Sequence, residues 1–147
     1  MNIRVLDFEI LTKHYVNYQN GINEINEERK SFIERLDPIK NEMESILKAS
    51  QSGLVINNSD ERSRAERFQI LQQEAIDIDN EFQHRMKEMK NDLNQKSYSE
   101  LEVIVKEWAE KNSIDLVTGK MEVIYNNDKY DSTNEILEVL KDKKLFI

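Results

Sequence analysis

Apolar residues recur at heptad spacing through the first third of the chain. From residue 18 to residue 46 they stand at alternating intervals of four and three, the a/d seam of a coiled-coil helix with one polar break. The seam consists of Tyr18, Ile22, Ile25, Arg29, Phe32, Leu36, Ile39, Met43 and Ile46. Pro38 leaves its phase unchanged, so we predict one helix over about residues 16–50 with a kink near Leu36. Arg29, at the break, is expected to pair with a glutamate of a facing helix and fix the register.

A second seam follows a short polar break at residues 51–60, where Gly53 favours a turn. Asn58 with Glu61 three residues later resembles a capping box, so we predict a new helix that starts there and reaches about Lys111. Its seam consists of Phe68, Leu71, Ala75, Ile78, Phe82, Met86, Met89, Leu93, Leu101, Ile104 and Trp108. Two long helices joined by a short turn predict an antiparallel hairpin.

The two ends of the chain carry short apolar runs of the kind found in strands. Residues 3–8 predict a strand followed by a brief helix over 9–15, residues 114–117 and 122–125 predict two more strands, and a last helix is expected after Asp131 or Ser132. We therefore predict an α+β fold in which a long antiparallel helical hairpin, a coiled-coil arm, is inserted in a small β-rich body. Its parts are residues 1–15 (body), 16–111 (arm, with its tip near 51–60) and 112–147 (body).

One subunit of this design supplies too few strands to close a sheet. Oligomerisation removes exposed sheet edges and buries apolar surface, so we expect the chain to associate with copies of itself. The strand residues expected to build the body and its contacts between subunits are Ile3, Val5, Leu6, Leu116, Val117, Val123 and Tyr125.

Composition and charge exclude several classes of protein. The 147 residues include 29 acidic and 21 basic side chains, and a net charge of −8 disfavours general nucleic-acid binding, which needs clustered Lys and Arg. The absence of cysteine excludes a disulfide framework, a thiolate zinc site and a cysteine nucleophile. No apolar run approaches the roughly 20 residues of a membrane span, so no direct membrane insertion is expected. No secretory signal follows Met1, which indicates a cytoplasmic chain as written, or a mature form with an added Met.

No constellation of residues predicts catalysis, a cofactor or a metal ion, so we expect a protein that is not an enzyme. His14 and His84 are the only histidines and lie far apart in sequence, without a partnered nucleophile. Residues 77–81 resemble a calcium loop superficially, but they lack its glycine and fall within a helical seam.

The most informative candidate for binding is the run Leu54, Val55 and Ile56 at the predicted arm tip. Three consecutive apolar residues there either contact a client or partner protein, or fold back over the end of the seam near Leu47 and Phe68. Folding back is the commoner arrangement, but both interpretations of this run stay open. Met43, Met86 and Met89 also suit an adaptable binding surface, although core packing is the usual role of such seam residues.

The C-terminal block carries a more specific pattern. Residues 114–117, 123–125, 128–131, Thr133 and 136–137 resemble, in order and spacing, the Skp/OmpH family of holdase chaperones, and residues 3–7 resemble that family's opening strand. The resemblance covers essentially the whole chain, and the last stretch looks most like versions from the Bacteroidetes lineage. It implies a jellyfish-like homotrimer that pools its strands in a β-barrel body, while three helical arms enclose a cavity.

The resemblance also implies a function. Family members hold unfolded clients, chiefly outer-membrane proteins, without ATP, so we expect an ATP-independent Skp-like holdase that encloses unfolded or assembling clients between the arms. This chain differs from the family in lacking an export signal and in having a nearly neutral tip region, with four basic and three acidic residues over residues 48–67. The alternative is therefore a trimeric coiled-coil structural or assembly component of a bacteriophage particle. A processed form would be periplasmic, and a phage protein would be associated with the virion.

Overall fold

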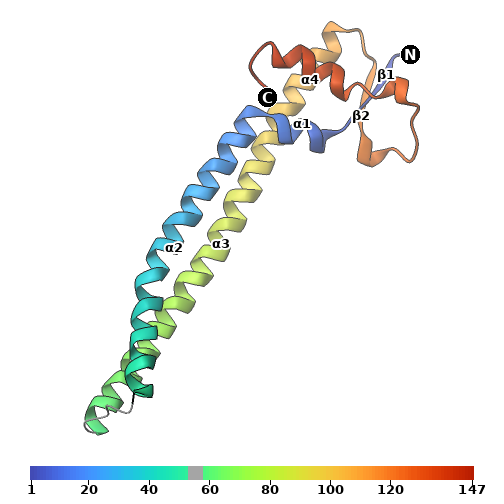
Figure 1. The fold of residues 1–147 in the computed structure, drawn as a ribbon. Helices are drawn as coiled ribbons and strands as arrows, with labels where there is room; N and C mark the ends of the chain where they lie inside the picture. Colours follow the sequence, from blue (N-terminus) through green and yellow to red (C-terminus); the bar gives the residue numbers. More distant parts are fainter. Residues whose placement is uncertain (53–57) are drawn as a thin grey trace. The chain divides into compact units, whose positions relative to one another are not determined.

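The structure is a computed structural model that describes residues 1–52 and 58–147, so the predicted tip residues Leu54, Val55 and Ile56 lie outside the described residues. It is mostly helical (Figure 1). In chain order the elements are β1 (Ile3–Leu6), α1 (Phe8–His14), α2 (Val16–Gln51), α3 (Asn58–Lys111), β2 (Leu116–Gly119), the 3-10 turns η1 (Lys120–Glu122) and η2 (Asp128–Tyr130), and α4 (Thr133–Lys141). The predicted pair of long helices, α2 and α3, is confirmed almost to the residue.

The chain divides into two compact units. The body unit comprises Met1–Glu24 and Lys90–Ile147, and the hairpin unit comprises Ile25–Met89. Both divisions fall inside the long helices rather than at their ends. The predicted division into body and arm instead has its limits at residues 15 and 111, where helices end. This division stays a prediction.

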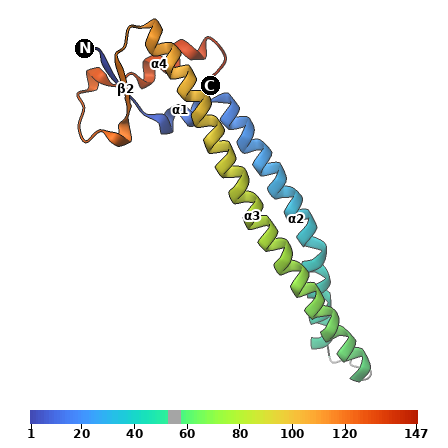
Figure 2. The same cartoon turned by 180° about the vertical axis from the view of Figure 1, so that it is seen from behind.

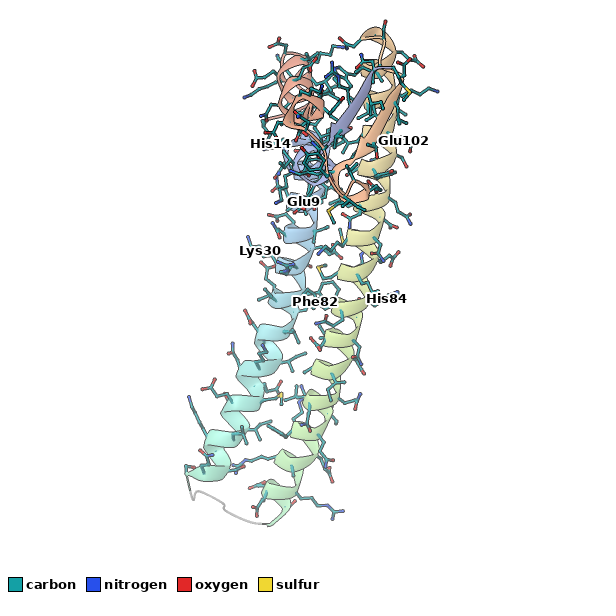
Figure 3. All side chains as sticks on the ribbon, turned by 90° about the vertical axis from the view of Figure 1, so that its right-hand side faces the viewer. Glu9, His14, Lys30, Phe82, His84 and Glu102 are labelled. Carbon is teal, nitrogen blue, oxygen red and sulfur yellow. The ribbon has the colours of Figure 1, made fainter. Side chains whose placement is uncertain are left out.

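The seam of the hairpin unit is apolar, as its heptad pattern predicts. Ile25, Phe32 and Leu71 are buried there. The rings of Phe32 and Phe82 meet edge to face with centroids 5.4 Å apart, and Phe82 points toward α2 (Figure 3). The helix α2 continues through Pro38, as predicted, and the kink near Leu36 stays a prediction.

Arg29 does not play the role that its place in the seam predicts. The side chain is exposed and forms no ion pair within residues 1–52 and 58–147, because a long basic side chain reaches water from the margin of a two-helix seam. The preceding residue makes the expected cross-helix contact instead: Glu28 lies 3.5 Å from Arg85 of α3.

The body unit is built around a small parallel sheet. Strands β1 and β2 pair in parallel, from Ile3 opposite Leu116 to Leu6 opposite Gly119 (Figures 1 and 2). On its other side β1 forms an isolated parallel bridge between Val5 and Asp131. Elements far apart in sequence pack over this sheet in one core, which consists of Leu6, Leu11, Tyr15, Leu101, Val105, Trp108, Ile136, Leu140 and Phe146.

The second predicted strand begins two residues later than expected because α3 ends in a tight turn. Ser113 has a positive φ of 51°, and Ile114 N donates to Ala109 O at 3.0 Å, the bond of a helix-terminating motif. Ile114 and Asp115 thus lie in the turn between α3 and β2 rather than in the strand.

The third predicted strand, over residues 122–125, is wrong. After β2 the chain turns into η1, and no regular structure follows until η2. Strand β1 is already flanked by β2 and by Asp131, and residues 122–125 do not pair with the outer edge of β2, which stays open within the described residues. Val123 is consequently half-buried outside any strand, and Tyr125 is 81% exposed.

Candidate functional site

Residues with catalytic potential are separated rather than gathered. In the described ranges 1–52 and 58–147, no group of three or more His, Cys, Asp or Glu side chains has the geometry to hold a metal ion. The His14 ring Nδ1 shares a hydrogen bond of 2.5 Å with Ile147 O, and the exposed His84 lies 3.8 Å from Glu88 (Figure 3). The calcium-like run is helical, and its Asp77 accepts a hydrogen bond from Gln73.

A polar relay joins three elements of the body unit. Thr133 Oγ1, at the start of α4, donates to Asp131 Oδ1 at 2.7 Å and accepts from Asp7 N at 2.9 Å. The Asp7 side chain in turn caps α1 by accepting from Glu9 N and Ile10 N. Burial alone raises the pKa of Asp131, but the hydrogen bonds from the Thr133 hydroxyl and backbone N–H outweigh it and hold that pKa below its usual value. The relay fixes where β1 ends and α1 begins.

A second polar cluster fixes the junction of α1 and α2 against α3. Tyr15 is almost fully buried; its hydroxyl donates to Glu100 Oε2 at 2.5 Å and accepts from Asn17 Nδ2 at 3.0 Å. Burial, together with this bond to Glu100, raises the pKa of Tyr15 to about 12. The same bond lowers the pKa of Glu100. Both clusters are positioned for stability, since neither presents a free nucleophile or base.

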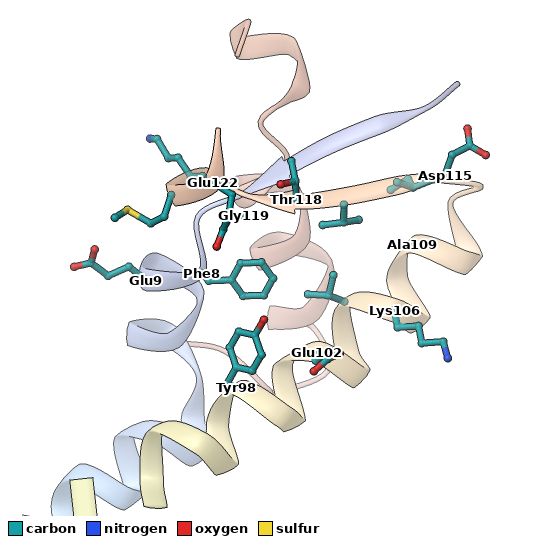
Figure 4. Close-up of a pocket in the computed structure, with 15 residues that line it drawn as sticks. Phe8, Glu9, Tyr98, Glu102, Lys106, Ala109, Asp115, Thr118, Gly119 and Glu122 are labelled. Carbon is teal, nitrogen blue, oxygen red and sulfur yellow. The ribbon is translucent and has the colours of Figure 1, made fainter. Parts of the chain in front are cut away.

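The body unit contains a pocket of about 550 Å³ beside β2. Phe8 from α1 and Tyr98 from α3 point into it, with ring centroids 6.0 Å apart (Figure 4). Its rim carries charges of both signs, from Glu9, Glu102, Lys106, Asp115, Lys120 and Glu122. Gly119 borders the pocket, and a Cβ there would overlap only the end of the exposed, flexible Glu122 side chain.

The predicted body residues fall into two groups. Val5 and Leu6 are buried in the core of their own chain, whereas Leu116 is 50% and Tyr125 81% exposed. Ile3, Val117 and Val123 are intermediate. Met121 and Ile124, which are almost fully exposed beside them, were not selected from the sequence; their apolar character in a charged stretch is the signal that marks them.

The hairpin unit has a hollow of about 340 Å³ between its two helices. The hollow is lined by Leu36, Lys40, Gln72, Ala75, Ile76 and Asp79. Ion pairs also link the helices: Arg35 to Glu81 at 3.1 Å and Arg67 to Glu42 at 2.8 Å, in addition to Arg85 with Glu28. The hydrogen bond from Arg67 lowers the pKa of Glu42. The heptad pattern did not predict the hollow, because it identifies core positions and gives no information about the margins of the seam.

Among the described residues, no helix combines the length and the apolar character that a membrane span requires. Comparison with known proteins then gives a family and a fold. Residues 2–140 match the family described as outer membrane protein (OmpH-like). A solved structure from Caulobacter crescentus CB15, described as a candidate outer membrane chaperone (OmpH-like), superposes with a TM-score of 0.59 over 99% of this chain and 87% of that one, at 15% identity. None of the curated proteins matches.

Proposed function

Since this chain belongs to the OmpH-like family, we propose that it is an ATP-independent Skp-like holdase that encloses unfolded or assembling client proteins between the helical arms of a homotrimer. The family is one of chaperones and not of enzymes. The observation that carries the proposal is the match over residues 2–140 together with the long α2–α3 hairpin, which lies in the sequence between the two parts of the body.

The physical features of the chain suit the holding of an unfolded client better than they suit catalysis. A holdase binds through many weak contacts, so it needs exposed apolar side chains within a charged surface rather than one convergent site. The hairpin unit provides such side chains, among them Ile33, Leu47 and Ile76, which are all about half exposed. Nucleotide use would require a phosphate-binding loop, and three glycines in the whole sequence do not form one.

The direct test is suppression of aggregation. An unfolded client is diluted from denaturant into buffer with and without the protein, in the absence of nucleotide, and light scattering is followed. We expect scattering to fall as the protein is added in stoichiometric amounts. Several clients, basic ones included, have to be tried, and failure with all of them overturns the proposal.

The homotrimer is supported by an apolar surface on the body unit. Four apolar side chains on and directly after β2 are half to fully exposed: Leu116, Met121, Ile124 and Tyr125. Exposed apolar side chains beside a two-stranded sheet are costly in water, and association relieves this cost. Light scattering coupled to size exclusion should give three times the 17.5 kDa chain mass, and a stable monomer or dimer contradicts the trimer.

The identity of the client separates a chaperone from a structural component. Outer-membrane proteins are the clients that the family name suggests for this chain. A transient chaperone leaves its client after assembly, so it is absent from purified cell-surface fractions and from virus particles. Stoichiometric presence in purified bacteriophage particles would instead establish the alternative, a trimeric structural or assembly component.

A further inference from the structure

The two flanks of the hairpin unit differ in chemistry. Glu28, Arg35 and Glu42 follow one another at intervals of seven residues, each directly before or beside a core position of α2. Each of them forms an ion pair with α3, at 3.5, 3.1 and 2.8 Å respectively. We name this side the ionic flank, because cross-helix charges close the seam along it.

The opposite flank is open. Ile33, Lys40 and Leu47 also follow at intervals of seven, each directly after a core residue of α2, and Ile33 remains 49% exposed. Lys40 and the half-exposed Ile76 of α3 line the 340 Å³ hollow, whose apolar wall is completed by Leu36 and Ala75. We name this side the hollow flank. Here the seam is accessible from solvent, whereas on the ionic flank it is covered.

We propose that the hollow flank is the surface on which the hairpin holds an unfolded polypeptide, with one large apolar client side chain seated in the hollow. This inference rests on the proposed holdase function and specifies where that function is performed. The hollow has the volume of one or two large side chains, and its floor is apolar. Gln72 at its edge carries an amide, which both donates and accepts hydrogen bonds and so suits the backbone of an extended client.

The charged side chains around the hollow favour binding of a client over an ion pair that would close the hollow within the hairpin. Within residues 1–52 and 58–147, Lys40 and Asp79 form no ion pair, although they line the same hollow. A client segment in which an apolar residue is flanked by polar or charged ones matches this arrangement. The ionic flank offers no such opportunity, because its charged groups already have partners.

The extent of the hollow flank also argues against a permanent contact with a second copy of the chain. Stable protein interfaces bury about 800 Å² on each partner. The hollow flank offers the half-exposed side chains of Ile33, Leu47 and Ile76, interrupted by Lys40. So small an apolar surface suits weak and exchangeable contacts, which is the behaviour that holding an unfolded client requires.

The first experiment compares two isoleucines of α3 that are almost equally exposed. Ile76 (48% exposed) lines the hollow, whereas Ile70 (52% exposed) is three residues from Arg67 of the ionic flank and does not line it. We expect Ile76→Ser to weaken retention of an unfolded client roughly fivefold, since one half-buried apolar contact is lost. Ile70→Ser should retain the client like the unsubstituted protein. Melting temperatures of both variants show whether each remains folded.

The second experiment uses the absence of native cysteine. The variants Gln72→Cys and Gln73→Cys place a photo-crosslinking label on the hollow or on the adjacent residue, which faces Asp77. Client crosslinking several times stronger from position 72 supports the proposal. Equal crosslinking from both positions overturns it, and so does crosslinking from 72 to a second copy when client is absent.

The outcomes separate this inference from the function on which it rests. If the unsubstituted protein retains no client, the holdase function itself fails. If it retains client, and Ile76→Ser behaves like Ile70→Ser, the holdase function stands and the assignment of the hollow flank is wrong.

Discussion

At the scale of single residues, Thr133 connects the start of α4 with the end of β1. Its hydroxyl is satisfied on both sides, by Asp131 and by Asp7 N, and the side chain is 4% exposed. We expect Thr133→Val to lower the free energy of unfolding by about 1–3 kcal/mol, because the near-isosteric side chain leaves the part-buried Asp7 N–H without its acceptor. Urea denaturation measures this loss. Thr133→Ser keeps the hydroxyl and should cost less, so equal losses would show that the methyl group matters as much as the relay.

The bond between Tyr15 and Glu100 gives stability a predictable dependence on pH. The pKa of Tyr15 rises from 10.0 in the unfolded chain to about 12, so its contribution is complete below pH 10 and is lost as the pH rises toward 12. The lowered pKa of Glu100 acts in the opposite direction: its contribution is present above the ordinary value of 4.5 and is lost as the pH falls below it. Tyr15→Phe removes the hydroxyl and should abolish the alkaline part of this dependence. Unfolding measured by circular dichroism across both pH ranges tests this dependence. If Tyr15→Phe loses stability at alkaline pH as the unsubstituted protein does, the loss does not come from the Tyr15 hydroxyl.

At the scale of elements, Pro38 is the clearest local defect of the hairpin. It lies inside α2, where it supplies no N–H for the carbonyl of Glu34. We expect Pro38→Ala to raise the free energy of unfolding by as much as about 3 kcal/mol, since the helix gains a hydrogen bond and loses a steric conflict. Thermal unfolding measures the gain. The exposed neighbour Asp37→Ala is the control and should shift stability by less than about 0.5 kcal/mol. Lower stability in Pro38→Ala would mean that packing requires the bend predicted near Leu36.

The elements also show which parts of the fold the sequence determines locally. Helical periodicity depends on residues three and four positions apart, so the prediction of helices over 16–50 and 58–111 matched α2 and α3 within one residue. Strand pairing depends on distant residues, and residues 122–125 stay unpaired although the outer edge of β2 is open in the part of the chain that the structure describes. The hollow depends on the register of α2 against α3. Ion pairs such as Arg35 with Glu81 show this register in the structure, but the seam pattern of the sequence does not contain it. Core positions were therefore predictable, and the candidate binding surface was not.

At the scale of the whole molecule, the acidic character of the chain has a consequence for the proposed homotrimer. Three copies of the chain would multiply the formal charge of −8 to −24. Such a field raises the local concentration of basic clients and repels acidic ones. Apolar contacts at the hollow flank do not weaken with salt, whereas this long-range attraction does, so the two contributions to client retention can be measured separately.

We expect a basic unfolded client to bind more tightly than an acidic client of the same length, with an advantage that shrinks as salt is added. The screening length falls from about 30 Å at 0.01 M salt to about 3 Å at 1 M, so the difference should largely disappear over that range. Dissociation constants for both clients, measured by fluorescence anisotropy at each salt concentration, test this. In Ile76→Ser, affinity should fall by a similar factor at every salt concentration, because the lost contact is apolar. A preference for basic clients that persists at 1 M salt would place the recognition of charge in short, desolvated ion pairs, with Asp79 at the edge of the hollow as the first residue to substitute.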